Sequence, residues 1–250
     1  MKYPFDGKVA LVTGASGGIG RATALAFAAS GARVIVSDVQ DEKGAETVAM
    51  ITERGGKAAF QHCDVSNEGH VRDLVAAALS QFGGLDFAHN NAGINRPGSN
   101  EWDTDDWTLS ININLSAVMF CMREEIAAML ESGGGAIVNT ASVNGLIGNP
   151  SQPGYCASKH GVIGLTRSAA LRYAKEGIRV NAVCPGVVDT PMVEQIAMVP
   201  QYKAAIEAMT PMGRMSQPEE ISSAVLWLCS AQASFVTGHP LVIDGGATAI

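Results

Sequence analysis

Tyr155 and Lys159 are the residues whose types and spacing most directly suggest chemistry. They stand four apart at the start of a helical pattern, so both side chains project from one face of a helix. A free tyrosine has a pKa of about 10, too high for a base at neutral pH, and a nearby ammonium lowers that pKa by favouring the phenolate. Ser142 ends a strand-like run thirteen residues before Tyr155, and ligands bind at that edge of a parallel sheet. The three residues predict a general acid–base site.

A glycine-rich turn could hold a dinucleotide beside them. Thr13-Gly14-Ala15-Ser16-Gly17-Gly18-Ile19-Gly20 follows the first strand-like run and opens the first helical pattern. Gly14 permits the tight turn, Gly18 lets the backbone approach a pyrophosphate, and Gly20 allows close packing of the helix on the sheet. The helix N-terminus presents N–H groups and a positive dipole to the phosphates.

The same turn also matches a hydrolase motif. Gly14-Ala15-Ser16-Gly17-Gly18 satisfies G-x-S-x-G, the nucleophile elbow of α/β-hydrolases. A hydrolase would need a downstream acid and then a histidine, for which Asp189 or Asp244 with His160 or His239 are available. An elbow normally follows several earlier strands, whereas this turn follows the first, so hydrolysis is the minority interpretation.

Asp38 predicts which dinucleotide binds. It ends the second strand-like run about 20 residues past the glycines, where a carboxylate accepts hydrogen bonds from the adenosine ribose hydroxyls. The same charge would repel a 2′-phosphate, and neither Gly17 nor Val39 supplies a cation to bind one. We therefore expect NAD rather than NADP.

Strand-like and helical patterns alternate along the chain and position these residues. The strand-like runs are Val9 to Thr13, Arg33 to Ser37, Ala58 to Cys63, Leu85 to His89, Ala136 to Thr140, Ile178 to Val183 and Leu241 to Ile243. The helical patterns are Ile19–Ser30, Asp41–Arg54, Glu68–Phe82, Thr104–Leu130, Tyr155–Lys175 and Glu219–Leu228. Short glycine-rich turns imply right-handed crossovers. We expect an α/β fold in which residues 1–250 form a single NAD-binding and catalytic domain, a Rossmann-like, doubly wound, seven-stranded parallel sheet with helices on both faces.

Composition excludes several classes of protein. The 250 residues include 17 basic and 24 acidic ones, a net charge of −7, with no basic block; this argues against nucleic acid or an anionic membrane as partner. No apolar run approaches the roughly 18–20 residues of a membrane span. The start, Met1 to Lys8, does not resemble a signal peptide. The five cysteines are widely spaced and the five histidines scattered, so we expect free thiols, a cytoplasmic protein and no metal.

The chain resembles the short-chain dehydrogenase/reductase family, in its single-domain branch of about 250 residues. The resemblance covers nearly the whole chain and rests on seven motifs in the expected order. They are Thr13-Gly14-x-x-x-Gly18-x-Gly20, Asn90-Asn91-Ala92-Gly93, Asn114, Ser142, Tyr155-x-x-x-Lys159, Pro185-Gly186 with Thr190, and Asp244-Gly245-Gly246.

The resemblance implies a catalytic tetrad. Tyr155 would be the general base or acid, and Ser142 would polarise the substrate oxygen. Lys159 would also bind the nicotinamide ribose, and the main chain of Asn114 would hold a water. Further residues implied to contact the cofactor are Ser16, Ile19, Asp64, Val65, Asn91, Gly93, Pro185, Gly186, Val188 and Thr190.

The expected substrate pocket is small and neutral. Its lining would be Asn95, Val143 to Gly145, Asn149 to Gln152 and Gly186 to Met192, without a lysine or arginine to clamp an anion. We therefore expect a neutral secondary alcohol or its ketone, and similarity to bacterial family members favours alicyclic alcohols or diols. Residues 190–215 would form a lid, and the resemblance implies a homotetramer. A non-catalytic dinucleotide sensor or scaffold on the same fold is the alternative.

Overall fold

Seven parallel strands form one sheet in the order β3-β2-β1-β4-β5-β6-β7. The computed structural model describes residues 3–95, 102–193, 201, 204–205 and 208–249. The strands are β1 (Val9–Thr13), β2 (Arg33–Asp38), β3 (Lys57–His62), β4 (Phe87–Asn90), β5 (Gly135–Thr140), β6 (Ile178–Pro185) and β7 (Pro240–Ile243). The predicted fold class is confirmed, and each predicted strand is present within two residues at either end.

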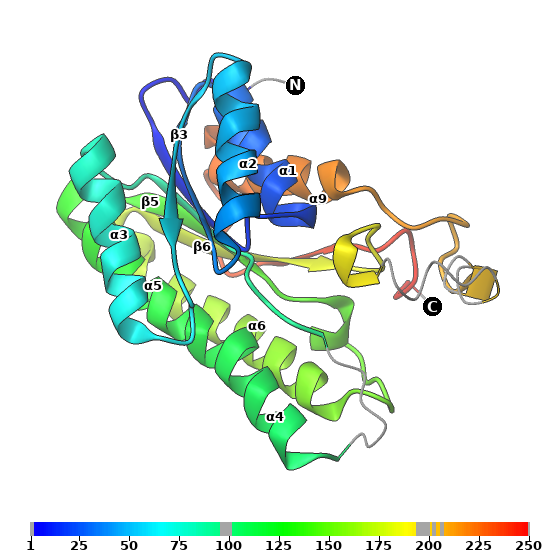
Figure 1. Cartoon of the computed structure of the whole chain (residues 1–250). Helices are drawn as coiled ribbons and strands as arrows, with labels where there is room; N and C mark the ends of the chain where they lie inside the picture. The colour runs from blue at the N-terminus through cyan, green and yellow to red at the C-terminus, as the bar shows by residue number, and fades with distance from the viewer. Residues whose placement is uncertain (1–2, 96–101, 194–200, 202–203, 206–207, 250) are drawn as a thin grey trace.

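Helices cover both faces of the sheet (Figure 1). On one face lie α1 (Gly18–Ala29), α2 (Asp41–Glu53) and α9 (Pro218–Cys229); on the other lie α3 (Glu68–Phe82), α4 (Thr104–Ile111), α5 (Ala117–Ser132) and α6 (Pro153–Tyr173). Each layer has its own apolar core, which includes Phe27, Ile51 and Ile221 on the first face and Leu74, Met129 and Val162 on the second. Because helices cover both sides, β1 is buried along its whole length.

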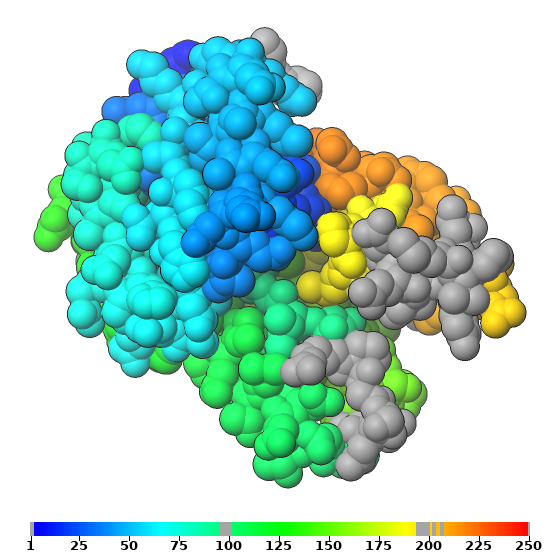
Figure 2. All heavy atoms as spheres, in the orientation of Figure 1, coloured from blue at the N-terminus to red at the C-terminus, as the bar shows by residue number. Residues whose placement is uncertain are grey.

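The reversal of strand order between β1 and β4 places the site. Chain connections run outward from these two neighbouring strands in opposite directions, which opens a crevice at their carboxyl ends. The glycine turn after β1 and the Asn91–Ala92 segment after β4 border that crevice, and Ser142 follows the next strand, β5. In the space-filling view the blue-to-cyan first half of the chain packs directly against the green, yellow and orange second half (Figure 2).

The predicted helix Thr104–Leu130 is present and extends to Ser132, but it contains one turn of a different kind. The turn Asn112–Ser116 between α4 and α5 is a π-helix, a wider turn that frequently marks functional sites. Asn114, at its centre, is completely buried. A period of 3.6 residues predicts the helical pattern but cannot reveal one wider turn within it.

The predicted lid, residues 190–215, lies partly outside the described residues. Its two ends are joined beside the sheet, because the Asp189 N–H donates to the Ser216 carbonyl at 2.9 Å and the Ser216 N–H donates to the Val187 carbonyl at 3.0 Å. The segment therefore begins and ends at the carboxyl end of β6. Within the described part of the chain, none of the helices has the length and apolarity that crossing a membrane requires.

Candidate active site

Ser142, Tyr155 and Lys159 converge beyond the carboxyl end of β5. Ser142 caps the short 3₁₀ turn Val143–Gly145, where its Oγ accepts the Asn144 N–H at 3.1 Å. Tyr155 lies in the first turn of α6, near enough to Ser142 for that side chain to lower the pKa of its phenol. Lys159 follows one helical turn later, with its Nζ 5.5 Å from the centroid of the Tyr155 ring. The predicted trio is thus brought together.

The ammonium of Lys159 is buried and anchored. The residue is 4% exposed, and its Nζ donates to the carbonyl oxygen of Thr140 at 2.8 Å. Burial lowers the pKa of Lys159 to about 8, because desolvation disfavours the charged form.

The pKa of the Tyr155 phenol is higher than that of a free tyrosine. Burial raises its pKa to about 12, while the hydrogen bond with Ser142 acts in the opposite direction. Desolvation of the phenolate outweighs the other effects in the chain by itself, and the lowering of this pKa by Lys159 together with a bound nicotinamide stays a prediction. Tyr155 is accordingly held as a neutral phenol, the form that donates a proton.

The side chain of Asn114 binds another backbone segment through both its oxygen and its nitrogen. Its Oδ1 accepts the Ile94 N–H at 2.8 Å and its Nδ2 donates to the Ile94 carbonyl at 2.9 Å. Gly93 permits this approach, since a Cβ there would lie 3.0 Å from Asn114 Oδ1 and 3.6 Å from Lys159 Nζ. The contact joins the π-helical turn to the segment after β4.

The glycine turn has the shape that a pyrophosphate needs. Gly14 and Gly18 have positive φ angles of 63° and 50°, and a Cβ on Gly20 would overlap the Gly14 carbonyl oxygen. Gly17 is the N-cap of α1 and makes no side-chain capping bond, which leaves the N–H groups of the first turn available to an anion. These residues fit the diphosphate of a dinucleotide.

Asn91 braces the glycine turn. Its backbone N–H donates to Thr13 Oγ1 at 3.0 Å, and its Nδ2 donates to the carbonyl oxygens of Thr13 at 3.1 Å and Gly14 at 3.3 Å. The predicted cofactor residue is therefore positioned against the turn, with its amide occupied by the protein itself.

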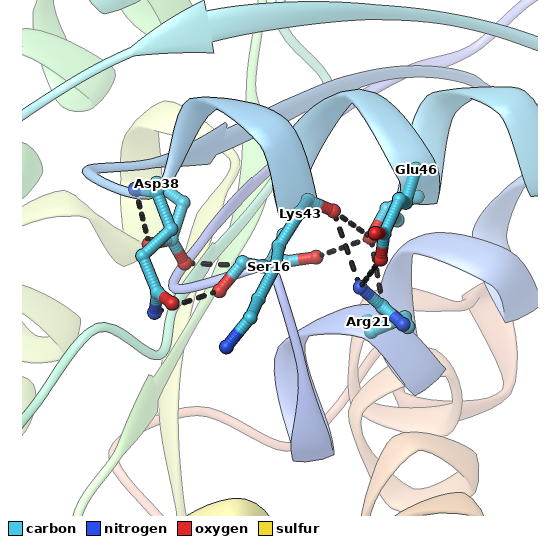
Figure 3. Close-up of polar contacts among 8 residues, drawn as sticks. Ser16, Arg21, Asp38, Lys43 and Glu46 are labelled. Atoms are coloured by element: carbon cyan, nitrogen blue, oxygen red, sulfur yellow. Dashed lines mark hydrogen bonds and ion pairs between the residues drawn. The ribbon is translucent and has the colours of Figure 1, made fainter.

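Asp38 lies beside Ser16 at the end of β2 (Figure 3). It is 8% exposed; its Oδ2 accepts the Ser16 N–H and its Oδ1 accepts the Gln40 N–H, both at 3.0 Å. The Ser16 hydroxyl accepts from Gln40 Nε2 at 3.3 Å. A nucleophilic serine needs an imidazole base, and the Ser16 hydroxyl pairs with an amide instead, which disfavours the hydrolase interpretation.

Arg21 is a cation close to this corner, but its guanidinium is occupied elsewhere. Its Nε donates to Thr47 Oγ1 at 3.0 Å, and its Nη2 contacts Glu46 Oε2 and the Lys43 carbonyl, each at 3.2 Å. Figure 3 shows this group on the opposite side of Ser16 from Asp38.

The remaining predicted cofactor residues lie along the same edge of the sheet. Asp64 and Val65 follow β3, which is joined to β2 there by a 3.1 Å bond from the Cys63 N–H to the Asp38 carbonyl. Pro185 ends β6, and the Gly186 N–H donates to the Ile243 carbonyl at 2.9 Å. Val188 is buried and bridges to Ser216. Thr190 lies against the glycine turn, since a Cβ on Gly18 would be 3.0 Å from its Cγ2.

Thr140 and His89 make contacts at the site that the sequence pattern did not predict. His89 Nε2 lies 2.9 Å from Thr140 Oγ1, and Thr140 Oγ1 donates to Asn91 Oδ1 at 3.4 Å. The Thr140 carbonyl is the acceptor for Lys159. Thr140 thus connects Lys159 to Asn91, which is bonded to the glycine turn. Its position at the strand end, two residues before Ser142, was the available signal.

No cluster of three potential metal ligands occurs among the His, Cys, Asp and Glu residues that the structure describes. The five cysteines are all free and buried.

Comparison with known proteins agrees over nearly the whole chain. A family model described as enoyl-(acyl carrier protein) reductase matches residues 14–248. A 2,5-dichloro-2,5-cyclohexadiene-1,4-diol dehydrogenase from Sphingobium indicum is 47% identical over 252 residues, covering 98% of each chain. A cyclohexanol dehydrogenase from Acinetobacter sp. is 44% identical over 250 residues, covering 99% of this chain and 98% of its own.

Solved structures also match over nearly the whole chain. The crystal structure of a short-chain type dehydrogenase/reductase from Mycobacterium marinum has a TM-score of 0.94 and 38% sequence identity, with 98% of this chain and 97% of the other covered. A structure from Agrobacterium tumefaciens with bound NADP has a TM-score of 0.90 and 36% identity, with both chains fully covered. The predicted resemblance is confirmed: the chain belongs to the short-chain dehydrogenase/reductase family.

Proposed function

We propose that the protein is an NAD-dependent alcohol dehydrogenase that interconverts a neutral, alicyclic secondary alcohol or diol and its ketone. The observation that carries this proposal is the convergence of Ser142, Tyr155 and Lys159 beside a glycine turn whose helix N-terminus has no side-chain cap. Acid–base groups and a dinucleotide cradle at one edge of the sheet are what hydride transfer to or from an alcohol requires.

Tyr155 moves the proton. In ketone reduction its neutral phenol donates to the carbonyl oxygen, and burial, which raises the pKa of Tyr155 to about 12, favours that form. In alcohol oxidation the phenolate accepts the hydroxyl proton, so this direction requires alkaline conditions or nearby positive charge. The Ser142 hydroxyl holds the reacting oxygen beside the phenol, and Lys159 brings its charge beneath the ring.

The cofactor residues are those of the glycine turn, Asp38 and the segment after β6. When bound, the nicotinamide supplies the hydride acceptor and a positive charge near the phenol. Asp38 supports NAD, because its carboxylate is held at the ribose end of the crevice and Arg21 is paired elsewhere. A similar solved structure contains bound NADP, so the preference of this chain for NAD over NADP has to be measured.

Relatives support the substrate class. One acts on cyclohexanol and another on a chlorinated cyclohexadienediol. The segments expected to line the pocket, Asn95, Val143 to Gly145 and Asn149 to Gln152, carry amide and apolar side chains without a cation. An anionic substrate or an acyl-carrier arm would lack a counter-charge there.

We propose that the protein is a homotetramer, as the family resemblance implies, and that it lies in the cytoplasm. Five free, buried cysteines suit a reducing compartment. Size-exclusion chromatography with light scattering measures the assembly directly.

The decisive experiment follows absorbance of the reduced nicotinamide at alkaline pH. It uses NAD or NADP with a panel of cyclic and acyclic secondary alcohols, for the wild type and Tyr155→Phe. We expect NAD-selective oxidation that the substitution abolishes while NAD binding, measured by calorimetry, persists. NAD binding without turnover of any alcohol or ketone would favour the non-catalytic sensor, and a preference for NADP would contradict the argument from Asp38.

A further inference from the structure

Four amide side chains form a cluster in front of α6. Gln152 Oε1 accepts from Asn149 Nδ2 at 3.2 Å and from Asn144 Nδ2 at 3.4 Å, and Gln152 Nε2 donates to Asn95 Oδ1 at 2.8 Å. All four residues are partly exposed. We call Asn95, Asn144, Asn149 and Gln152 the amide cluster. Gln152 is its hub, because its side chain bonds to each of the other three.

Three members of the amide cluster are close along the chain to Tyr155, to Ser142 and to the segment that Asn114 binds. Gln152 is the N-cap of α6, three residues before Tyr155. Asn144 is two residues past Ser142 and donates its backbone N–H to the Ser142 hydroxyl at 3.1 Å. Asn95 follows Ile94, the residue whose backbone is bound by Asn114. A substrate whose hydroxyl meets Tyr155 and Ser142 therefore has the amide cluster as its neighbour.

Helix formation does not require this arrangement. Gln152 makes no side-chain capping bond, although Ser, Thr, Asp or Asn at an N-cap would stabilise the helix better. Pro153, at the first helical position, already removes one backbone donor that a cap would satisfy. The Gln152 side chain instead bonds to Asn95, a residue 57 positions away in the sequence.

The amide cluster retains hydrogen-bonding capacity. Each primary amide has two N–H donors and a carbonyl acceptor with two lone pairs. Among the described residues, Asn144 Oδ1 accepts no hydrogen bond and Asn95 Nδ2 donates none. The cluster is neutral and offers both a donor and an acceptor, which suits a hydroxyl or ketone oxygen better than a carboxylate or phosphate.

We propose that the amide cluster binds a second, uncharged oxygen of the substrate and so makes the enzyme selective for cyclic diols and hydroxyketones over mono-alcohols. The inference rests on the proposed dehydrogenase function and narrows its substrate class. Gln152 is the specificity-determining residue, because losing it disconnects the other three amides. A pocket that hydrogen-bonds a substrate hydroxyl discriminates against the analogue that lacks one.

The test compares cyclohexane-1,2-diol, cyclohexane-1,4-diol and cyclohexanol with NAD, in the wild type, Gln152→Leu and Gln81→Leu. The Gln81 side chain is exposed at the end of α3, so its variant is the matched control. We expect the wild type to favour at least one diol on the order of tenfold in kcat/KM. In Gln152→Leu this ratio should fall toward one through a higher KM for the diol; in Gln81→Leu it should equal that of the wild type.

The outcomes separate the two proposals. Equal kcat/KM for cyclohexanol and both diols in the wild type, or a diol preference that survives Gln152→Leu, overturns the role of the amide cluster while the dehydrogenase function stands. No oxidation of any of the three alcohols, together with no reduction of their ketones, overturns the proposed function itself. Should Gln152→Leu lose its helical circular dichroism, Asn95→Leu provides the same comparison from the other end of the cluster.

Discussion

Lys159 Nζ donates a 2.8 Å hydrogen bond to the carbonyl oxygen of Thr140, the last residue of β5. This contact fixes a buried amine relative to the strand that leads to Ser142, and it sets the amine beneath the Tyr155 ring. A carbonyl offers only a partial negative charge, so it holds the amine in place without offsetting its burial, and the pKa of Lys159 stays lowered to about 8.

Lys159→Met should therefore impair alcohol oxidation strongly. The substitution keeps an unbranched side chain but removes an amine that is charged below about pH 8, so in that range the Tyr155 phenolate becomes still harder to form. We expect kcat to fall by at least about 100-fold, the scale of general acid–base effects, and the rise of the oxidation rate with pH to move to higher pH. Lys175→Met, at an exposed position after α6, is the control; an unshifted profile in Lys159→Met would refute the electrostatic role.

Asp38→Asn should change the choice of cofactor. The substitution removes the charge that repels a 2′-phosphate and retains one oxygen, which can accept the N–H of either Ser16 or Gln40. We expect the ratio of kcat/KM for NAD to that for NADP to fall by roughly tenfold, as one charge interaction changes. Steady-state kinetics with both cofactors measure it, with the exposed Asp73→Asn as control. An unchanged ratio would place the discrimination elsewhere.

Local spacing predicted most of the fold and the residues of the candidate site. The glycine turn, Asp38 and the Tyr155–Lys159 pair depend on neighbours within one strand, turn or helix, and such short-range requirements leave a readable pattern. The raised pKa of Tyr155 could not be predicted, because burial is a property of the assembled layers. The π-helical turn at Asn114 likewise depends on a partner from another segment, Ile94.

Gly20→Ala should damage the first turn. A Cβ at Gly20 would overlap the Gly14 carbonyl oxygen, a backbone atom that cannot turn aside. We expect a loss of about 1–3 kcal/mol in the free energy of unfolding, seen as a lower Tm, together with weaker NAD binding. Gly84→Ala is the matched control, because a Cβ there meets nothing within 4 Å. Equal Tm values for the two variants would contradict the close approach.

His89 should make the protein sensitive to acid. It is fully buried, its Nδ1 has no partner among the described residues, and burial lowers its pKa to about 3. The unfolded chain takes up this proton near pH 6.5, so the stability contribution is complete above that pH and is lost as the pH falls below it.

His89→Phe should therefore reduce the loss of Tm between pH 7.5 and pH 5. The variant lacks the bond to Thr140, worth about 1 kcal/mol at neutral pH. As the pH falls, its Tm should decrease less than that of the wild type, because it has no imidazole to protonate. Differential scanning fluorimetry at several pH values measures this, and the exposed His239→Phe is the control. The same acid sensitivity in His89→Phe and the wild type would assign the effect to other groups.

Glu125 should have the opposite pH dependence. It is 1% exposed in α5, its Oε2 accepts from Asn90 Nδ2 at 2.9 Å, and its Oε1 has no partner among the described residues. Burial raises the pKa of Glu125 from 4.5 to about 7. The native state thus keeps a proton that the unfolded chain releases, so stability is greatest below pH 4.5 and declines as the pH rises through 7.

Glu125→Gln should remove this decline. The amide preserves the shape of the side chain and an oxygen for Asn90, and it has no charge to bury. We expect its Tm to match that of the wild type near pH 5 and to exceed it at pH 9, with a gain of at most about 3 kcal/mol in the free energy of unfolding. Glu131→Gln, at an exposed position on the same helix, should leave Tm unchanged at both pH values. If Glu125→Gln showed the same difference from the wild type at pH 5 and pH 9, ionisation of the buried carboxyl would not be the cause.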